Sequence, residues 1–338
     1  MACHYTSGGA GSGQAHDSKI GDTVDSGIRM HIPDNFLSPP VWATLDVVAI
    51  PTFGIIARHA SRQMEDARIP LLGVMGAFVF AAQMINFPVG LGTSAHLVGG
   101  ALLAYALGPA FAVITLTAIL ATQAFVFQDG GVLALGANVF NMAIAGVLAA
   151  SVIYQLWGRG PGRKAAIFLG AFFSVMVSGV LALVELLVSK VPMSRELVLG
   201  SIGLFTVNAL AEGAITLAVI QAIERLNPGW VQKPEASNRK IVAALGAFAL
   251  LLVGAGFLLA SAAPDGLERI GILTGMASKS TFHAPLADYQ LPFWSSNWGR
   301  RAVAGIAGLG VIFGLCAFAG KVLGGRPEKP KREAACTT

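Results

Sequence analysis

The stretch AAIFLGAFFSVMVSGVLALVELL, from Ala165 to Leu187, contains a single charged residue, Glu185. Its length matches the ~20 residues that an α-helix needs to cross ~30 Å of hydrocarbon. A strand of a membrane barrel would alternate apolar and polar residues over about 10 positions, whereas this stretch is apolar on every face and rich in glycine and alanine. It therefore predicts a membrane-spanning helix.

Similar apolar blocks recur along the chain. Of its 338 residues, 54% are hydrophobic and only 12% are charged, and the mean hydropathy is +0.67, whereas soluble domains carry about twice that charged fraction. We predict an all-α fold, a polytopic integral membrane helical bundle of about nine transmembrane helices, seven followed by two, the third being short. The expected helices are 41–57, 70–87, 94–107, 110–127, 138–155, 165–188, 197–222, 241–261 and 302–322.

The distribution of basic residues predicts the orientation. They lie mostly in loops between apolar blocks rather than on one face, so the net charge of +5 does not indicate a nucleic-acid partner. Alternate loops hold 15 of the 23 lysine and arginine residues. Because cytoplasmic loops carry this excess, we place the N-terminus outside and the C-terminus in the cytoplasm, in a plasma or inner membrane.

A charged, turn-rich stretch around Asn227-Pro228-Gly229 and Lys233-Pro234-Glu235 divides the chain. Seven predicted spans precede it and two follow, as in a fusion of two subunits. The predicted organisation is an extension at 1–29, which is a mis-assigned start or a disordered tail, a first domain at 30–223, a cytoplasmic linker at 224–240, a two-helix domain at 241–325 and a basic cytoplasmic tail at 326–338.

Two of the six histidines, His31 and His96, are expected at the outer membrane face. If Met30 is the first residue, its α-amine and the amide and Nδ1 of His31 occupy three corners of a square, and His96 can fill the fourth. Four planar nitrogens suit Ni(II) or Cu(II), with Co(II) a further candidate, whereas Zn(II) prefers a tetrahedron. The alternative is that both histidines are interfacial side chains, and the residues alone leave both interpretations open.

Two stretches carry a family resemblance: Met30 to Pro39, and Phe87 to Gly100 with His96 inside it. They resemble the substrate-binding component of nickel and cobalt energy-coupling-factor (ECF) transporters, the CbiM/NikM family. The last two helices resemble its small companion subunit, the NikN-like PDGLE domain, in the motifs Pro264-Asp265-Gly266-Leu267-Glu268 and His283-Ala284-Pro285-Leu286-Ala287-Asp288-Tyr289.

The resemblance implies that Met30, His31 and His96 hold the metal. It also implies a transmembrane coupling subunit and cytoplasmic ATPase subunits as partners, Ni(II) or Co(II) as the imported substrate for nickel enzymes or cobalamin biosynthesis, and no bound organic cofactor. This chain departs from the family in its extension, which would convert the amine of Met30 into a peptide nitrogen. It also has Asn35 where the family usually has glycine, and asparagine tolerates a positive φ.

Other polar residues are weaker candidates. Ser94, Asn138 and Asn141 could orient the metal ligands, and His283 could relay metal toward His96. Polar contacts between helices explain the asparagines as well, and loop packing explains His283 as well. Asp265 is expected to cap a short helix near Leu267. Asp46, Glu185 and Glu212 are expected to join helices or contact a partner subunit, and Asn208 and Glu212 share one helix face.

Three functional hypotheses follow. The first is an importer subunit without its own ATPase site, since the stretch from Gly314 to Val322 has the wrong spacing for a phosphate loop. The second is an ion-driven secondary transporter or exporter that carries protons on Asp46 and Glu212. The third, an intramembrane hydrolase using Ser94 and His96, is disfavoured because Ser and His two residues apart rarely align as nucleophile and base.

Overall fold

Helices account for nearly all of the regular structure. The computed structural model describes residues 31–90, 93–228, 239–259, 261, 263–276, 283–289 and 297–324. The α-helices are α1 Pro39–Ser61, α2 Ile69–Gln83, α3 Gly100–Leu107, α4 Pro109–Thr122, α5 Leu135–Asn138, α6 Val147–Trp157, α7 Arg163–Val188, α8 Arg195–Leu226, α9 Arg239–Leu259, α10 Gly266–Thr274 and α11 Asn297–Gly324. Short 3-10 turns lie at η1 Asp66–Arg68 and η4 Ala287–Tyr289, and π-helical segments at η2 Gln123–Phe127 and η3 Val139–Gly146.

The described residues form a multi-pass membrane protein. They contain 6 helices long and apolar enough to cross a bilayer: Pro39–Ser61, Pro109–Phe127, Leu135–Trp157, Arg163–Val188, Arg195–Leu226 and Gly299–Gly324. The helix Ile69–Gln83 is apolar but shorter. The helical membrane architecture predicted from the sequence is confirmed, while the count of nine spans and the orientation stay predictions.

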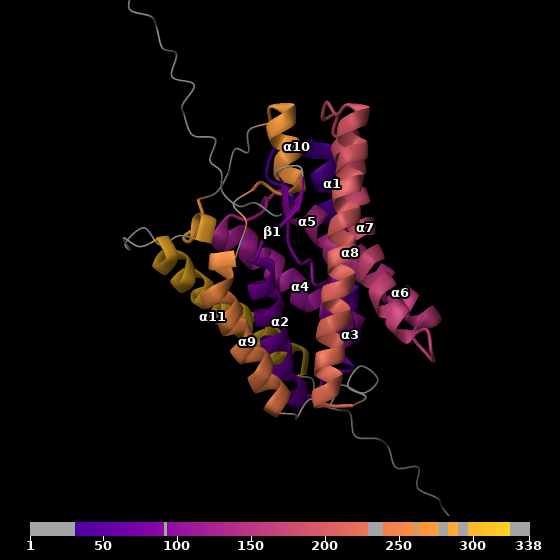
Figure 1. The fold of residues 1–338 in the computed structure, drawn as a ribbon, viewed down its shortest axis with the longest axis vertical. Helices are drawn as coiled ribbons and strands as arrows, with labels where there is room; N and C mark the ends of the chain where they lie inside the picture. The colour runs from indigo at the N-terminus through magenta and orange to yellow at the C-terminus, as the bar shows by residue number, and fades with distance from the viewer. Residues whose placement is uncertain are drawn as a thin grey trace, which may run out of the picture.

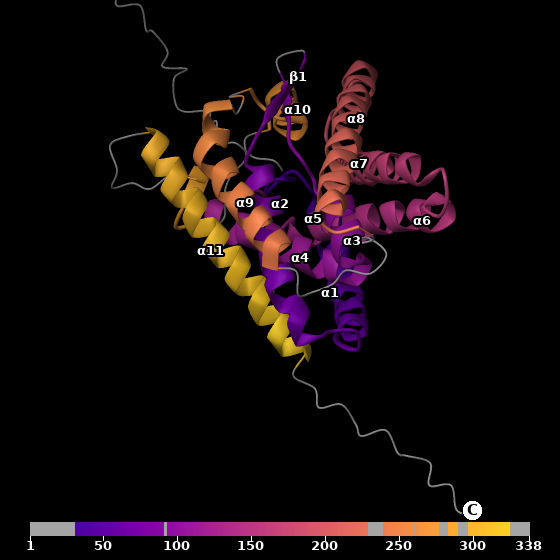
Figure 2. The same ribbon diagram turned by 60° about the horizontal axis from the view of Figure 1, so that its bottom comes forward.

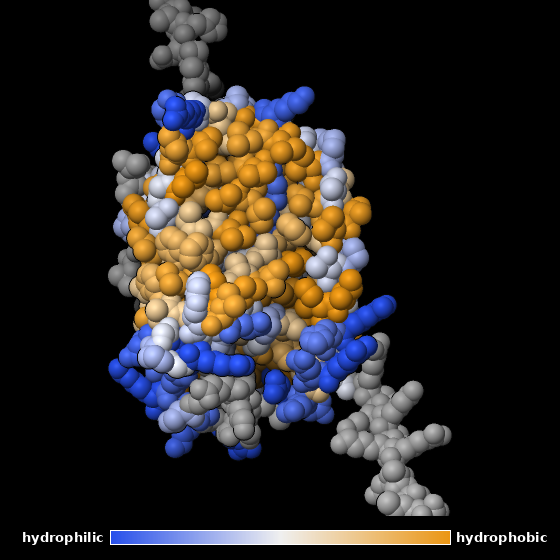
Figure 3. Space-filling view, turned by 90° about the vertical axis from the view of Figure 1, so that its right-hand side faces the viewer, coloured by the Kyte–Doolittle hydropathy of each residue, from blue (hydrophilic) through white to orange (hydrophobic). Residues whose placement is uncertain are grey.

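The outer surface of the bundle is apolar, as lipid requires. On α1, Val47 is 72% exposed and Ile50 is 70% exposed, which would be costly in water. Figure 3 shows a broad apolar belt between hydrophilic residues at the two ends of the molecule. This arrangement fits a bilayer in which the belt contacts the hydrocarbon and the charged ends contact water.

Two groups of helices flank the bundle. On one side α7 packs along both α6 and α8, and on the other α2 packs against α9 and α11, so the C-terminal helices lie directly on the first domain (Figures 1 and 2). Small residues permit these close approaches. A Cβ on Gly76 of α2 would lie 2.9 Å from Cys316 Sγ of α11, and a Cβ on Gly170 of α7 would collide with the Tyr105 hydroxyl. Gly170 thus allows Tyr105 to approach α7 closely.

The helix expected at 94–107 begins later than predicted. Residues Phe87–Gly90 (β1) and Thr93–Ala95 (β2) form an antiparallel hairpin in which Phe87 faces Ala95 and Pro88 faces Ser94. Helix α3 starts only at Gly100, because Gly99 has the left-handed φ of 78° that interrupts a helix. The hairpin and this glycine leave His96 in a loop between strand and helix.

Two spans contain π-helical turns. The predicted helix 138–155 is a continuous run of α5, η3 and α6, and α4 ends in η2. A π-turn inserts one extra residue per turn, and such turns are frequent at functional sites. Here η3 carries Asn141, and η2 leads into Gln128 and Asp129.

Candidate metal site

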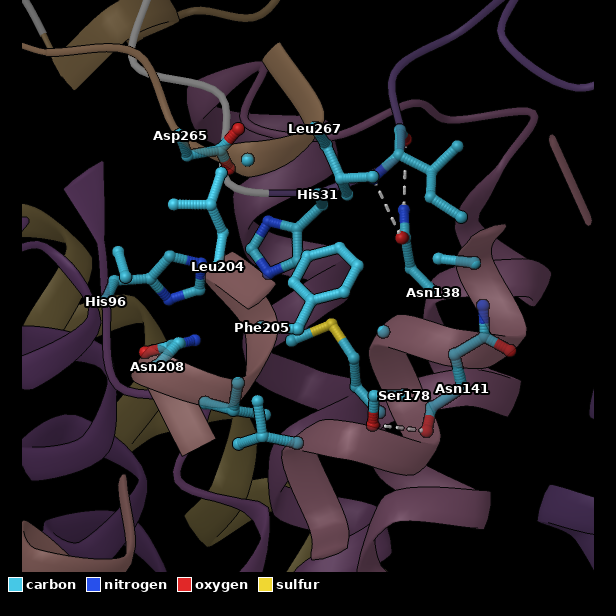
Figure 4. Close-up of a pocket in the computed structure, with 18 of the residues that line it drawn as sticks. His31, His96, Asn138, Asn141, Ser178, Leu204, Phe205, Asn208, Asp265 and Leu267 are labelled. Carbon is cyan, nitrogen blue, oxygen red and sulfur yellow. Dashed lines mark hydrogen bonds between the residues drawn. The ribbon is translucent and has the colours of Figure 1, made fainter. Parts of the chain in front are cut away.

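A cavity of ≈ 90 Å³ lies where the hairpin, α8, α10 and the first described residues meet (Figure 4). Organic ligands usually need about 300 Å³ or more, so this volume suits an ion rather than a cofactor. Segments far apart in the sequence line it, and the lining residues include His31, His96, Asn138, Met142, Phe205 and Gly266.

His31 and His96 face each other across this cavity (Figure 4). Their ring centres are 5.9 Å apart with the planes tilted by 52°, and the residues are 1% and 6% exposed. Two imidazoles bound to one ion at about 2.0–2.1 Å would have ring centres about 4.5–6.5 Å apart. The separation therefore fits one ion between them. Met30, the third predicted ligand, lies outside the described residues.

The His31 ring is held at one nitrogen. Its Nδ1 lies 3.3 Å from Oδ1 of Asp129, whose other oxygen accepts a 2.7 Å hydrogen bond from the Tyr289 hydroxyl. Within the described residues its Nε2 is buried without a hydrogen-bond partner. A buried imidazole nitrogen with no protein partner suits a ligand atom. The chelate predicted from the sequence uses Nδ1, so that arrangement requires Nδ1 to turn from Asp129 to the metal.

The backbone after His31 is clamped by Asn138. The Asn138 side chain accepts the Ile32 N–H through Oδ1 at 3.0 Å and donates from Nδ2 to the Ile32 carbonyl at 3.1 Å. Gly131 N–H donates to the same carbonyl at 2.9 Å. Gly130 has φ +102° and a Cβ on it would lie 2.9 Å from His31 Cβ, so only glycine fits there. Asn138 therefore fixes the backbone that follows His31, and its role behind the metal ligands stays a prediction.

The turn after His31 forms with asparagine in the glycine position. Asn35 has φ 70°, as its residue type allows. The preceding Asp34 accepts the Leu133 N–H at 2.8 Å, which ties the turn to the loop before α5. The predicted survival of this turn is confirmed.

The segment around His96 is held from several elements. Its Nδ1 lies 2.9 Å from the Leu97 carbonyl, to which it can donate. Glu212 of α8 accepts the N–H groups of Val98 and Gly99 at 2.7 and 2.8 Å. Asn208, one turn earlier on α8, lies beside His96 in Figure 4. Of the two residues predicted to share one face of α8, Glu212 bonds to this loop and Asn208 lines the cavity.

Ser94 lines the cavity but bonds to the C-terminal domain. Its hydroxyl donates to the Ala263 carbonyl at 2.6 Å, its N–H donates to the Pro264 carbonyl at 2.8 Å, and it forms a parallel bridge with Asp265. These contacts dock the PDGLE motif onto the His96 loop. A hydroxyl that donates to a carbonyl gives no support to a nucleophilic serine.

The remaining intramembrane polar residues join helices. Asn141 lines the cavity and donates to Oε2 of Glu185 on α7 at 2.9 Å. Asp46 of α1 accepts the Gly136 N–H of α5 at 2.9 Å. Asp46 and Glu185 thus have the interhelical role that was the favoured interpretation.

Two loop residues had predicted roles, Asp265 as a helix cap and His283 as a metal relay. Asp265 caps α10, accepting the Glu268 N–H at 2.7 Å. Burial raises the pKa of its carboxyl well above the usual range. His283 is exposed and is not among the residues that line the cavity. Its relay role stays a prediction, and the side chain of its neighbour Asp288 lies outside the described residues.

Sequence reasoning did not single out Asp129, Gly130 or Gly131, which hold the His31 segment, and it gave Tyr289 only as part of a motif. A signal existed, because an acid followed by two glycines between two apolar blocks indicates a tight turn beside a polar group. The contact from Tyr289 crosses 160 residues of sequence, and no local pattern could indicate it.

The sequence of this chain is similar to those of known metal transport proteins. Residues 31–230 match the family model described as the cobalt uptake substrate-specific transmembrane region (CbiM), and residues 239–325 match the PDGLE domain. The fused nickel transport protein NikMN of Rhodobacter capsulatus is 30% identical over 303 residues, covering 82% of this chain and 81% of that protein. The cobalt transport protein CbiM of Thermosediminibacter oceani is 34% identical over 209 residues, covering 58% of this chain and 85% of that one.

A solved structure has the same fold. The crystal structure of a truncated transition metal transporter superposes with a TM-score of 0.53 at 30% sequence identity, covering 58% of this chain and 99% of the other.

Proposed function

The chain belongs to the family of cobalt uptake substrate-specific transmembrane regions, with a PDGLE domain behind it, and from this premise we propose that it captures Ni(II) or Co(II) outside the membrane for import. The observation that carries the proposal is the buried His31–His96 pair with ring centres 5.9 Å apart in a cavity of ≈ 90 Å³. The ion is the transported substrate, and no organic cofactor is part of the proposal.

The proposed ligands are the α-amine of Met30, His31 and His96. Nitrogen ligands of this kind suit Ni(II) and Co(II). The amine is a ligand only if the protein begins at Met30 or is processed to it, and we favour a start at Met30. Asn138 is proposed to support His31 through its two hydrogen bonds to Ile32.

Energy is proposed to come from partner subunits. As the substrate-specific component of an ATP-driven ECF transporter, the chain would work with a transmembrane coupling subunit and cytoplasmic ATPase subunits. The proposed organisation is nine spans with the N-terminus outside, a metal-binding domain at 30–223, a linker at 224–240 and a companion domain at 241–325. The chain is a transport component, not an enzyme.

The ion-driven alternative receives less support. It needs Asp46 and Glu212 to exchange protons, but Asp46 accepts a backbone N–H and Glu212 accepts two. These contacts give both carboxyl groups a structural role, and they give no specific support to proton transport. Nickel uptake by cells with and without the ATPase subunits separates the two mechanisms. Uptake that persists without those subunits would overturn the ATP-driven proposal.

The ligand proposal is tested by titrating purified protein with Ni(II) and with Co(II). Four proteins that begin at Met30 are compared: wild type, His31→Ala, His96→Ala and the control His59→Ala, whose exposed imidazole contacts Gln63. We expect each of the two site variants to bind at least about 100-fold more weakly and the control to bind like wild type. Equal affinities in all four proteins would refute the site.

The start site is tested with a second pair of proteins. Wild type beginning at Met30 should bind Ni(II) tightly, and wild type beginning at Met1 should bind it poorly because its amine is remote. Tight binding by a protein shown by N-terminal sequencing to begin at Met1 would remove Met30 from the ligand set. The same titrations compare nickel with cobalt.

A further inference from the structure

A buried carboxylate from a distant helix holds the segment that follows His96. Glu212, on α8, accepts the Val98 N–H through Oε2 at 2.7 Å and the Gly99 N–H through Oε1 at 2.8 Å. The residue is 0% exposed. Both side-chain oxygens are thus engaged by backbone N–H groups of one loop. The two peptide groups directly after Leu97 are therefore tied to α8.

A second side chain holds Val98 from the opposite direction. Gln83, at the end of α2, donates from Nε2 to the Val98 carbonyl at 2.8 Å. Gln123 donates in turn to Oε1 of Gln83 at 3.0 Å, which fixes the orientation of the Gln83 amide. Both glutamines are fully buried. Val98 is thus held between α2 and α8.

The local chain cannot supply these contacts itself. Helix α3 has 8 residues, all buried, and no side chain of its own first turn caps it. The N–H groups at its start need acceptors, and inside a membrane bundle water is scarce. Glu212 provides both acceptors from another helix. Without Glu212, the N–H groups of Val98 and Gly99 would lose these acceptors in the bundle interior.

From these contacts we infer that Glu212 is a positioning residue of the metal site. It fixes Val98 and Gly99 so that His96 stands opposite His31 at the separation that one ion can bridge. Glu212 does not line the cavity, so it acts through the His96 loop and not as a ligand. The inference rests on the proposed metal-binding function and adds a residue to it. Metal sites lose affinity when their ligands shift by about 0.5 Å or more.

The test compares Glu212→Gln with Glu224→Gln in the full chain beginning at Met30, purified in detergent and titrated with Ni(II). Glu224 is a matched control because it lies on the same helix and its carboxylate is bonded to Arg163 away from the cavity. We expect Glu212→Gln to weaken Ni(II) binding about 10- to 100-fold, since its amide can accept only one of the two N–H groups well. Glu224→Gln should stay within about threefold of wild type.

A double-mutant cycle separates positioning from general damage. In a His96→Ala background, Glu212→Gln should change the affinity by less than about twofold, because the ligand through which it acts is gone. A further loss of the full size in that background would overturn the inference. The d–d absorption of bound Ni(II) gives an independent readout, and it should change in Glu212→Gln but not in Glu224→Gln.

Gln83→Met provides a second variant if Glu212→Gln does not fold. It removes the donor to Val98 and introduces an apolar side chain of similar length, and it should weaken Ni(II) binding about 3- to 10-fold. If wild type binds Ni(II), His96→Ala abolishes tight binding, and neither Glu212→Gln nor Gln83→Met differs from Glu224→Gln, the inference alone is wrong. If wild type binds neither metal, the proposed function falls and the inference with it.

Discussion

The Tyr289 hydroxyl donates a 2.7 Å hydrogen bond to Oδ2 of Asp129, and this bond joins the C-terminal domain to the first domain. The Tyr289 ring also stacks on Phe127, with centres 4.5 Å apart and planes at 14°. Because Oδ1 of Asp129 lies 3.3 Å from His31 Nδ1, the contact ends beside the candidate metal site. The PDGLE motif reaches the same cavity through its bonds to Ser94.

Replacing Tyr289 with phenylalanine should loosen the docking of residues 283–289. The variant keeps the stacking and loses a hydrogen bond to a carboxylate, worth about 1.5–3 kcal/mol. Leu286 N–H bonds to the Val126 carbonyl in this segment, so its hydrogen exchange should become at least tenfold faster. Tyr105→Phe, which loses a hydroxyl bonded to Ala150, should leave this peptide unchanged. Equal exchange in both variants and wild type would show that the bond is unimportant for docking.

The membrane fold could be predicted because it depends on apolar length, which the sequence states directly. The blocks around α1, α7 and α8 were located to within a few residues, since a spanning helix must satisfy its backbone internally. The start of α3 was wrong because glycine and proline near Pro88 and Gly99 fit both a helix end and a hairpin. Only the pairing of β1 with β2 distinguishes them.

The candidate site was predictable where local chemistry marks it and unpredictable where it depends on contacts. His31 and His96 are two of only six histidines in an apolar chain, so few pairs of possible metal ligands had to be considered. The role of Glu212 could not be read from its own helix, because its partners are backbone N–H groups more than 100 residues earlier. For the same reason the bond from the Ser94 hydroxyl to Ala263 could not be predicted, although Ser94 lines the cavity as its sequence position suggested.

Asn138→Ala should weaken Ni(II) binding about tenfold. The substitution leaves the buried Ile32 N–H without its acceptor, which costs about 1–3 kcal/mol, while the Ile32 carbonyl keeps its bond from Gly131. The His31 segment should then become less well positioned. Thr122→Ala is the control, since it removes a buried hydroxyl bonded within its own helix. Calorimetric titration gives both affinities, and equal values would show that Asn138 does not support His31.

Ser94→Ala should leave nickel uptake within about twofold of wild type. The backbone bond from Ser94 N–H to Pro264 remains, so the His96 loop stays docked after the hydroxyl is lost. A nucleophilic serine would behave differently, since its removal costs about 10³-fold or more. Uptake of radioactive nickel by intact cells distinguishes the outcomes. A loss of that size would revive the hydrolase hypothesis.

The stability of the metal-free protein should depend on pH through Asp265. Burial is the largest cause that raises the pKa of its carboxyl, and the nearby carboxylates of Glu268 and Asp129 add to the rise. The folded protein therefore keeps this proton at pH values where the unfolded chain has lost it. The unfolded state binds fewer protons there, so this group's contribution to stability falls as pH rises from the unfolded toward the folded pKa.

Asp265→Asn should remove that loss of stability. Asparagine still offers an oxygen to the Glu268 N–H as a helix cap but carries no charge into the buried site. Its thermal midpoint should lie above that of wild type at about pH 7.5 and approach the wild-type value near about pH 4. Asp66→Asn, at an exposed carboxyl, should follow the wild-type pH profile. A difference between Asp265→Asn and wild type that is the same at every pH would mean that capping, and not the buried charge, controls the stability of this segment.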